Sequence, residues 1–194
     1  PEGLETSVDI PTEAPEITIP KLINYFKEKD IEALGIGCFG PIDLNEHSDT
    51  YGYITSTPKL KWVNFDMVGT FKEALHIPVG FDTDVNGSVL GEATFGCAKG
   101  LENVIYITIG TGVGVGVVSN GKLLHGMMHP ESGHILLVKH PSDTYAGKCP
   151  YHGCCLEGMA AGPAIEDRWG AKAYDLKDNM AVWELEAYYI AQAL

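Results

Sequence analysis

Residues 104–122 restrict the possible folds of this chain more than any other segment. The β-branched run Val104–Ile109 leads into alternating glycines across Gly110–Gly116, and an Asn-Gly pair follows at 120–121. An Asn-Gly pair between apolar runs is the strongest short-range signal for a two-residue hairpin turn. The segment therefore predicts a strand, a tight turn, a second strand, an Asn-Gly turn and a third strand.

The same glycines exclude two familiar nucleotide-binding loops. A Walker A loop needs a Lys followed by Ser or Thr after its glycines, and neither pair occurs here. A Rossmann fingerprint opens a helix, whereas these glycines alternate and lead into a hairpin. Gly110, Thr111 and Gly112 still offer unhindered N–H groups and a hydroxyl that could approach phosphate oxygens. A glycine-rich turn with no ligand explains the pattern equally well.

The remainder of the chain alternates helical and strand patterns, which indicates a mixed α/β fold. Apolar residues from Ile19 to Phe26 recur at helical spacing, and a short strand is expected at Val79–Phe81. We place a domain boundary near residue 102, which divides the chain into residues 1–102 and 103–194. Helices are also expected at residues 67–75, 86–95, 160–173 and 181–194.

The charge balance excludes some classes of partner. Thirteen Lys and Arg oppose 26 Asp and Glu, which gives a net charge of −13. Nucleic acid binding requires clustered basic residues, so we expect no nucleic acid partner. An anionic membrane surface is disfavoured for the same reason. The longest uncharged stretch is interrupted by glycines and reads as strands, so we expect no membrane span.

Cysteines and histidines cluster near the middle of the second half. His134, Cys149, His152 and Cys155 are separated by fourteen, two and two residues. Two thiolates and two imidazoles suit tetrahedral zinc, and four protein ligands close the site, so the role should be structural. Such a cluster favours a metal site in a reducing compartment over a disulfide scaffold or free buried cysteines. Cys154 could replace Cys155, but Cys149 and Cys155 flank His152 symmetrically, which favours Cys155.

Asp84 follows the short strand expected at residues 79–81. A carboxylate at the end of a strand can accept a proton from a substrate hydroxyl. Taken alone, Asp84 would instead cap the helix expected from Asn86. Asp82 is a second carboxylate in the same turn.

Two further carboxylates lie beside the Cys/His cluster. Glu131 precedes His134 by three residues, and Glu157 follows Cys155 by two. Carboxylates on a loop stiffened by a metal suit recognition of a polyol, because they accept hydrogen bonds from hydroxyl groups. Singly, each could equally be a solvated surface acid.

Together, these motifs resemble the ROK family of sugar kinases and repressors. The resemblance runs from about Lys21 to Leu194, and the cysteine loop with its flanks is similar to the bacterial fructokinase branch. The motifs that carry it occur in one order: Gly40-Pro41-Ile42-Asp43, Asp84-Val85-Asn86, Gly110-Thr111-Gly112-Val113-Gly114, Glu131-Ser132-Gly133-His134, Cys149-Pro150-Tyr151-His152-Gly153-Cys154-Cys155-Leu156-Glu157, Arg168-Trp169-Gly170 and Trp183-Glu184-Leu185-Glu186-Ala187-Tyr188-Tyr189.

The resemblance implies an actin-like, ribonuclease-H-like ATPase fold of two α/β lobes with the active site in a cleft. It implies ATP, Mg²⁺, structural Zn²⁺ and D-fructose as ligands, with fructose 6-phosphate as product, in a cytoplasmic homodimer. By the resemblance, Asp84 is the catalytic base. The sugar-binding positions would be Gly40, Asn64, Asn86, Glu131, His134 and Glu157; the second phosphate loop would be Gly110, Thr111 and Gly112; and the metal ligands would be His134, Cys149, His152 and Cys155.

Two segments of the family pattern have no counterpart in this sequence. The Asp-x-Gly-Gly-Thr hairpin of the first phosphate loop does not occur, and neither does the C-terminal glycine-rich segment that helps seat adenosine. We therefore expect these residues to hold the sugar and zinc sites but only half of the nucleotide site. A ROK kinase for glucose, mannose or N-acetylglucosamine, a ROK repressor and a zinc-bound sugar sensor are the alternatives.

Overall fold

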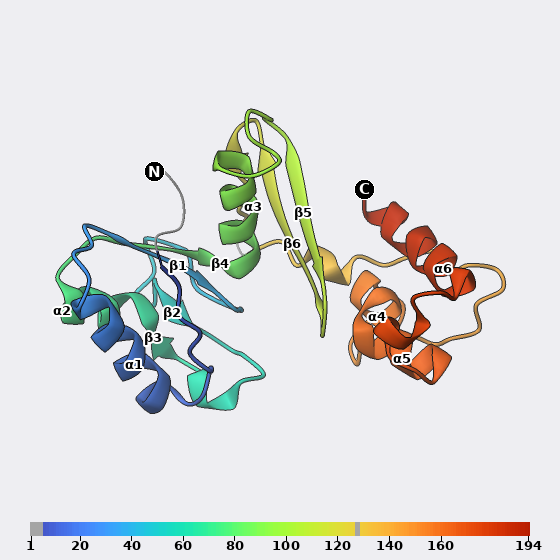
Figure 1. The fold of residues 1–194 in the computed structure, drawn as a ribbon, viewed down its shortest axis with the longest axis horizontal. Helices are drawn as coiled ribbons and strands as arrows, with labels where there is room; N and C mark the ends of the chain where they lie inside the picture. Colours follow the sequence, from blue (N-terminus) through green and yellow to red (C-terminus); the bar gives the residue numbers. More distant parts are fainter. Residues whose placement is uncertain (1–5, 127–128) are drawn as a thin grey trace. The chain divides into compact units, whose positions relative to one another are not determined.

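The computed structural model describes residues 6–126 and 129–194. The chain folds as two compact units, the first ending at Asp84 and the second comprising Val85–Leu194 (Figure 1). The division lies before the boundary expected near residue 102, because the helix that starts at Asp84 packs on the strands that follow it.

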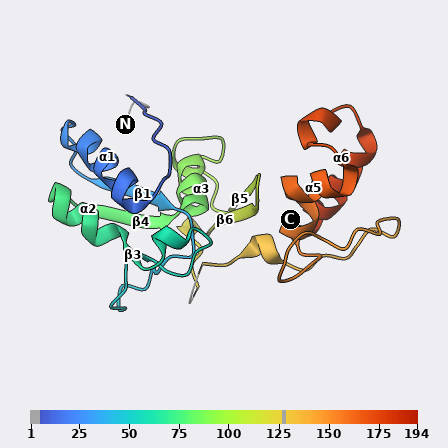
Figure 2. The ribbon, with the colours of Figure 1, turned by 90° about the horizontal axis from the view of Figure 1, so that it is seen from below.

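The first unit combines two helices with two pairs of strands. Strands β1 (Leu34–Cys38) and β4 (Val79–Thr83) are parallel neighbours, with Cys38 opposite Thr83. The short strands β2 (Tyr53–Ile54) and β3 (Phe65–Asp66) pair antiparallel, and the 3-10 turn η1 (Leu60–Trp62) lies between them in the chain. Helices α1 (Pro15–Lys27) and α2 (Met67–Leu75) lie side by side (Figure 2).

Local sequence explains both helices of this unit. Helix α1 begins with a proline, carries Glu16 in its first turn and Lys27 in its last, as the helix dipole favours. The side chain of Asp66 caps α2 by accepting a hydrogen bond from the Gly69 N–H at 2.7 Å. The helical faces predicted for residues 19–26 and 67–75 are confirmed, and they cover a core that includes Ile19, Ile54, Trp62, Val68 and Phe71.

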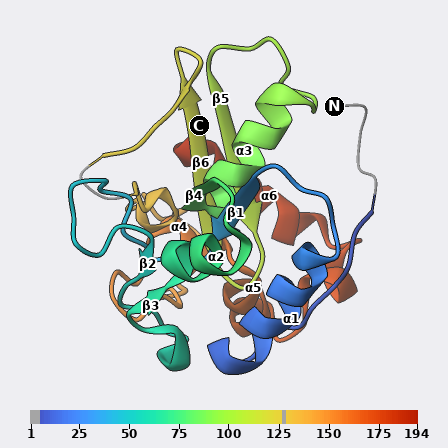
Figure 3. The same ribbon diagram turned by 90° about the vertical axis from the view of Figure 1, so that its left-hand side faces the viewer.

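The predicted hairpin is the centre of the second unit. Strands β5 (Val104–Ile109), β6 (Val113–Ser119) and β7 (Lys122–Leu123) form an antiparallel sheet in that order. Helix α3 (Asp84–Thr94) runs along β5 and β6 (Figure 3). The approach is close, because a Cβ on Gly116 would collide with the carbonyl oxygen of Val85. This packing assigns the residues from Val85 onward to the second unit.

Beyond the sheet, the second unit is helical. The turn η2 (Ser132–His134) precedes α4 (Leu156–Ala160), α5 (Gly162–Trp169), η3 (Ala173–Leu176), α6 (Met180–Ile190) and η4 (Ala191–Ala193). The single helix expected at residues 160–173 was wrong. Ala161 is extended, and Pro163 would clash with the preceding turn of a continuous helix, so α5 starts anew. The core here includes Val113, Leu156, Met159, Ala160 and Tyr189.

Across residues 6–126 and 129–194, every helix is too short or too polar to cross a bilayer.

Candidate active site and metal centre

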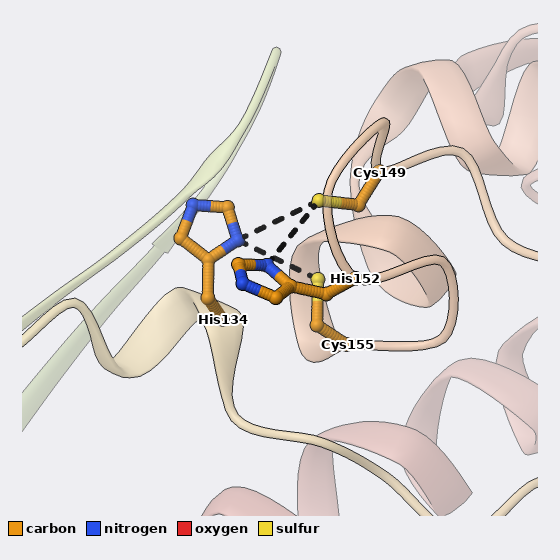
Figure 4. A group of neighbouring side chains, drawn as sticks. All are labelled: His134, Cys149, His152 and Cys155. Carbon is orange, nitrogen blue, oxygen red and sulfur yellow. Dashed lines mark hydrogen bonds between the residues drawn. The ribbon is translucent and has the colours of Figure 1, made fainter.

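Four side chains of the second unit converge on one point. The ligand atoms of His134, Cys149, His152 and Cys155 all lie within 4.8 Å of one another (Figure 4). The His134 Nδ1 atom is 3.8 Å from Cys149 Sγ and 3.5 Å from Cys155 Sγ, and the His152 Nδ1 atom is 3.7 Å from Cys149 Sγ. The structure therefore brings together the four residues that the spacing predicted as metal ligands.

These distances fit a tetrahedral zinc ion. Zn–S and Zn–N bonds of about 2.3 and 2.1 Å at tetrahedral angles separate neighbouring sulfur and nitrogen atoms by about 3.6 Å. The three sulfur–nitrogen separations of 3.5–3.8 Å match that edge. Burial raises the pKa of the Cys155 thiol, as does the adjacent Cys149, and a cation at this point would favour the thiolates instead. The donor set and its geometry are thus suited to zinc.

Local backbone structure positions each ligand. His134 ends η2, and Cys155 is the N-cap of α4, where its sulfur accepts a hydrogen bond from the Gly158 N–H at 3.4 Å. The Gly153 N–H donates to the Cys149 carbonyl at 3.0 Å and closes the loop between the two cysteines. Two short loops therefore present all four ligands.

The structure favours Cys155 over Cys154. Cys155 is fully buried and contributes its sulfur to the cluster, whereas the half-buried Cys154 lies outside it. The Cys154 carbonyl accepts a hydrogen bond from the Leu137 N–H at 3.2 Å, so residue 154 serves as a backbone bridge.

His134 has two predicted roles, as a metal ligand and as a sugar contact. Its Nδ1 atom faces the two cysteine sulfurs, and the opposite ring nitrogen points away from them (Figure 4). One ring could therefore hold a metal through Nδ1 and contact a hydroxyl through Nε2.

Asp84 lies at the carboxyl end of β4, where that strand gives way to α3. Its side chain is exposed, and its Cα is 3.3 Å from the position that a Cβ on Gly37 would take. Burial raises the pKa of the nearby Cys38 thiol to about 12, and the negative charge of Asp84 adds to that shift. Asp84 therefore follows β4 and lies close to β1. It is at the carboxyl ends of these parallel strands, where ligands of α/β sheets usually bind. The competing Asp82 is half-buried, and its Oδ1 accepts a hydrogen bond from the Thr83 N–H at 2.7 Å.

The other predicted sugar-binding residues differ in exposure. Gly40 and Asn64 belong to the first unit, as Asp84 does, and Asn64 is exposed with a φ of 58°. Asn86, in the first turn of α3, is fully buried, and its Nδ2 lies 3.4 Å from Nε2 of His125. Glu131 is exposed at the start of η2. Sequence reasoning missed His125, which lies 39 residues from its partner.

The predicted phosphate turn connects β5 to β6. Within it, the Gly110 N–H donates to the Gly112 carbonyl at 2.9 Å. Glu157, from the first turn of α4, accepts a hydrogen bond from the Val113 N–H at 3.1 Å through Oε2. The Gly162 N–H donates to the Gly110 carbonyl at 2.8 Å. Glu157 therefore contacts the turn from α4, the helix that Cys155 caps.

A pocket of about 840 Å³ lies beside this turn. Gly110 and Thr111 form one wall, and η3 and α6 contribute Tyr174, Trp183 and Glu186. Aromatic and apolar walls with a few polar groups are typical of pockets that bind small molecules. The sequence did not predict this pocket, because its walls come from segments about 70 residues apart.

Sequence reasoning also missed a buried charge cluster behind the pocket. Arg168, the only arginine of the chain, lies 3.0 Å from Glu186 and 3.4 Å from Asp143. It also donates a hydrogen bond to the Met159 carbonyl of α4 at 2.8 Å, and Tyr189 donates to Asp143 at 2.6 Å. The cluster joins the loop before the cysteines to α4, α5 and α6. The one hint of this cluster in the sequence was that an acidic chain contains a single arginine.

Glu186 predicts a pH dependence of stability. Burial raises the pKa of its carboxyl group to about 7, although Arg168 opposes the shift. The folded state therefore binds this proton more tightly than the unfolded state, and stability falls as the pH rises from about 4.5 to 7, by up to roughly 3 kcal/mol. We expect Glu186→Gln to lose less free energy of unfolding than the unsubstituted protein between pH 5 and pH 8 in urea titrations.

The neighbouring Glu184 provides the matched control for that measurement. It lies on the same helix but is exposed, so Glu184→Gln should keep the pH dependence of the unsubstituted protein. Equal pH slopes for Glu186→Gln and Glu184→Gln would contradict the assignment of a raised pKa to Glu186.

Comparison with known proteins supports a single family. The sequence matches the ROK family from residue 2 to residue 191. It is 50% identical over 183 residues to a fructokinase of Lactococcus lactis subsp. cremoris, which covers 94% of this chain and 62% of that protein. It is 47% identical over 191 residues to a fructokinase of Streptococcus mutans, which covers 96% of this chain and 64% of that protein.

A solved structure supports the fold. The ROK hexokinase of Thermus thermophilus superposes with a TM-score of 0.76 at 26% identity, covering 96% of this chain and 66% of that one. The matched region corresponds to less than two thirds of the length of each of the two fructokinases. The expected fold class is confirmed: this chain belongs to the ROK family and has its actin-like ATPase fold.

Proposed function

We propose that the full protein transfers the γ-phosphoryl group of ATP to D-fructose and forms fructose 6-phosphate. The observation that carries this proposal is the identity of about half the residues with two proteins named fructokinase, along nearly the whole of this chain. The position of Asp84 and the glycine turn between β5 and β6 agree with a kinase.

In this proposal, Asp84 is the general base. Its exposed carboxylate, at the end of β4, accepts the proton of the sugar 6-hydroxyl as that oxygen attacks the γ-phosphorus in line. The proposed hydrogen-bonding partners of the sugar are Asn64 in the first unit and Glu131, His134 and Glu157 in the second, because carboxylates, imidazoles and amides pair well with hydroxyl groups. Gly40 and Asn86 are proposed as further sugar-binding residues.

The nucleotide would bind in the second unit. Among Gly110, Thr111 and Gly112, the Gly112 N–H and the exposed Thr111 hydroxyl suit phosphate oxygens, while the Gly110 N–H donates to the Gly112 carbonyl and shapes the turn. Mg²⁺ would supply the remaining neutralising charge. The adjacent pocket could accept the nucleoside, because Trp183 and Tyr174 offer flat apolar surfaces. Phosphates met by backbone groups and Mg²⁺ need few basic side chains, which reconciles this function with a net charge of −13.

The metal centre has a structural role in this proposal. Zinc held by His134, Cys149, His152 and Cys155 has four protein ligands and therefore no open position for chemistry. We further propose a cytoplasmic homodimer without nucleic acid partners; the acidic charge balance disfavours binding to nucleic acid.

A coupled phosphorylation assay on a sugar panel tests the function. The full protein should phosphorylate fructose with a higher kcat/KM than glucose, mannose or N-acetylglucosamine. Preference for another hexose would redirect the substrate assignment to another ROK kinase. Sugar binding without turnover would favour a repressor or sensor.

A further inference from the structure

Two segments that carry metal ligands also contact the phosphate turn. Cys155 caps α4, and Glu157, two residues later, accepts the Val113 N–H at 3.1 Å. The same Glu157 Oε2 atom lies 2.6 Å from the position that a Cβ on Gly112 would occupy. The carboxylate is therefore seated against the turn backbone, in a space that is open because residue 112 is a glycine.

The second segment reaches the turn from the His134 side. Gly133, buried in η2 beside this ligand, packs so closely on Val113 that an added Cβ would collide with the Val113 carbonyl oxygen. Val113 is thus held at its N–H by Glu157 and at its carbonyl by η2. One support lies in η2, which ends at the predicted ligand His134, and the other in α4, which the predicted ligand Cys155 caps at its start.

The far end of α4 completes the contact. The Gly162 N–H, just beyond this five-residue helix, donates to the Gly110 carbonyl at 2.8 Å. Glu157 of α4 therefore holds the residue after the turn, and Gly162, which starts α5 two positions after α4 ends, holds the first residue of the turn. A shift of α4 would move both ends of the turn together.

We propose that Glu157 is a positioning residue through which the metal centre fixes the conformation of the phosphate turn. This inference rests on the proposed function, because it assumes zinc at the four ligands and phosphate at the turn. The charge of Glu157 makes its placement important. The Val113 N–H stabilises the carboxylate and fixes its position, whereas a released carboxylate keeps the same negative charge and could move closer to incoming phosphate and repel it more strongly.

Amide hydrogen exchange at Val113 tests this link without any catalytic readout. With zinc bound, we expect Glu157→Ala to speed exchange of the Val113 N–H about tenfold or more, whereas Glu157→Gln keeps an acceptor oxygen and most of the protection. Removing zinc from the unsubstituted protein with a chelator should speed the same amide. The Gly121 N–H, which donates to the Glu102 carbonyl at 2.8 Å, should not change and serves as the control.

Steady-state kinetics of the full protein provide the second readout. Both Glu157 variants should raise the KM for sugar, because both lose a charged hydroxyl acceptor. Only Glu157→Ala should raise the KM for ATP, by roughly fivefold or more. Glu157→Gln should have nearly the same KM for ATP as the unsubstituted protein.

The exchange result separates failure of this link from failure of the proposed function. Unchanged Val113 exchange in zinc-bound Glu157→Ala, or after zinc removal with Gly121 still protected, would overturn the link even if the protein phosphorylates fructose. Faster Val113 exchange would support it even if another sugar proves to be the substrate. If chelation speeds exchange of the Gly121 N–H as well, zinc removal has loosened more than the turn. The exchange of Val113 in zinc-bound Glu157→Ala then decides whether the link exists.

Discussion

Asp84→Asn is expected to lower kcat by about 10²–10⁴-fold while the KM for sugar changes little. Asn keeps the size and polarity of Asp84 but cannot accept the proton of the attacking hydroxyl at neutral pH. The position at the end of β4 should change little, because the side chain is exposed and Asn has nearly the same shape as Asp. Coupled steady-state assays with saturating ATP and varied fructose would measure both parameters.

Asp82→Asn is the matched control for Asp84→Asn. Asp82 lies two residues before Asp84, within β4, but its Oδ1 accepts a hydrogen bond from the adjacent Thr83 N–H, which an amide oxygen can also accept. This variant should therefore keep most of the kcat. Near-normal turnover in Asp84→Asn, or a larger loss in Asp82→Asn, would remove the role of general base from Asp84.

Cys155→Ser is expected to reduce the bound zinc from one ion per chain to nearly none. The hydroxyl that replaces the thiolate is a poor zinc ligand, and Cys155 is fully buried at the start of α4. The midpoint of thermal unfolding should fall by roughly 10 °C or more, since each kcal/mol shifts it by about 2–4 °C in a chain of this size. Metal analysis and thermal denaturation would measure the two effects.

Cys154→Ser tests the same chemistry one residue away. Cys154 contributes a backbone carbonyl, and its sulfur lies outside the cluster, so the variant should keep its zinc and its unfolding midpoint. The expectation fails if the Cys154 variant loses zinc and the Cys155 variant retains it. Absence of zinc from the unsubstituted protein would reject the metal assignment itself.

Local patterns predicted much of the fold correctly. The segment from Val104 to Lys122 folds as expected, because the Asn-Gly turn and the β-branched runs act over a few residues. The four ligands could be predicted because three of them share one short loop. The helix expected at residues 160–173 was wrong. Its composition suggested one continuous helix, but Pro163 fits only the first turn of a helix, so a new helix starts at Gly162.

Long-range contacts were beyond the reach of these patterns. The hydrogen bond between Glu157 and Val113 spans 44 residues, and the ion pair between Arg168 and Asp143 spans 25. No periodicity encodes such contacts, because they depend on how α4 and α5 pack against the sheet and the cysteine loop. The pocket beside Thr111 arises in the same way, from a turn and helices that are distant in the chain.

The sequence by itself determined which residue types are available and where the local elements begin: the hairpin strands, the acidic strand end at Asp84, and the spacing of the metal ligands. The spacing already favoured Cys155 over Cys154, and the tertiary structure brings the Cys155 sulfur into the cluster. The tertiary structure alone decided that Glu157 contacts the turn. The physical reason is that coordination and hydrogen bonding depend on distances of about 2–4 Å between side chains, and only packing fixes these distances.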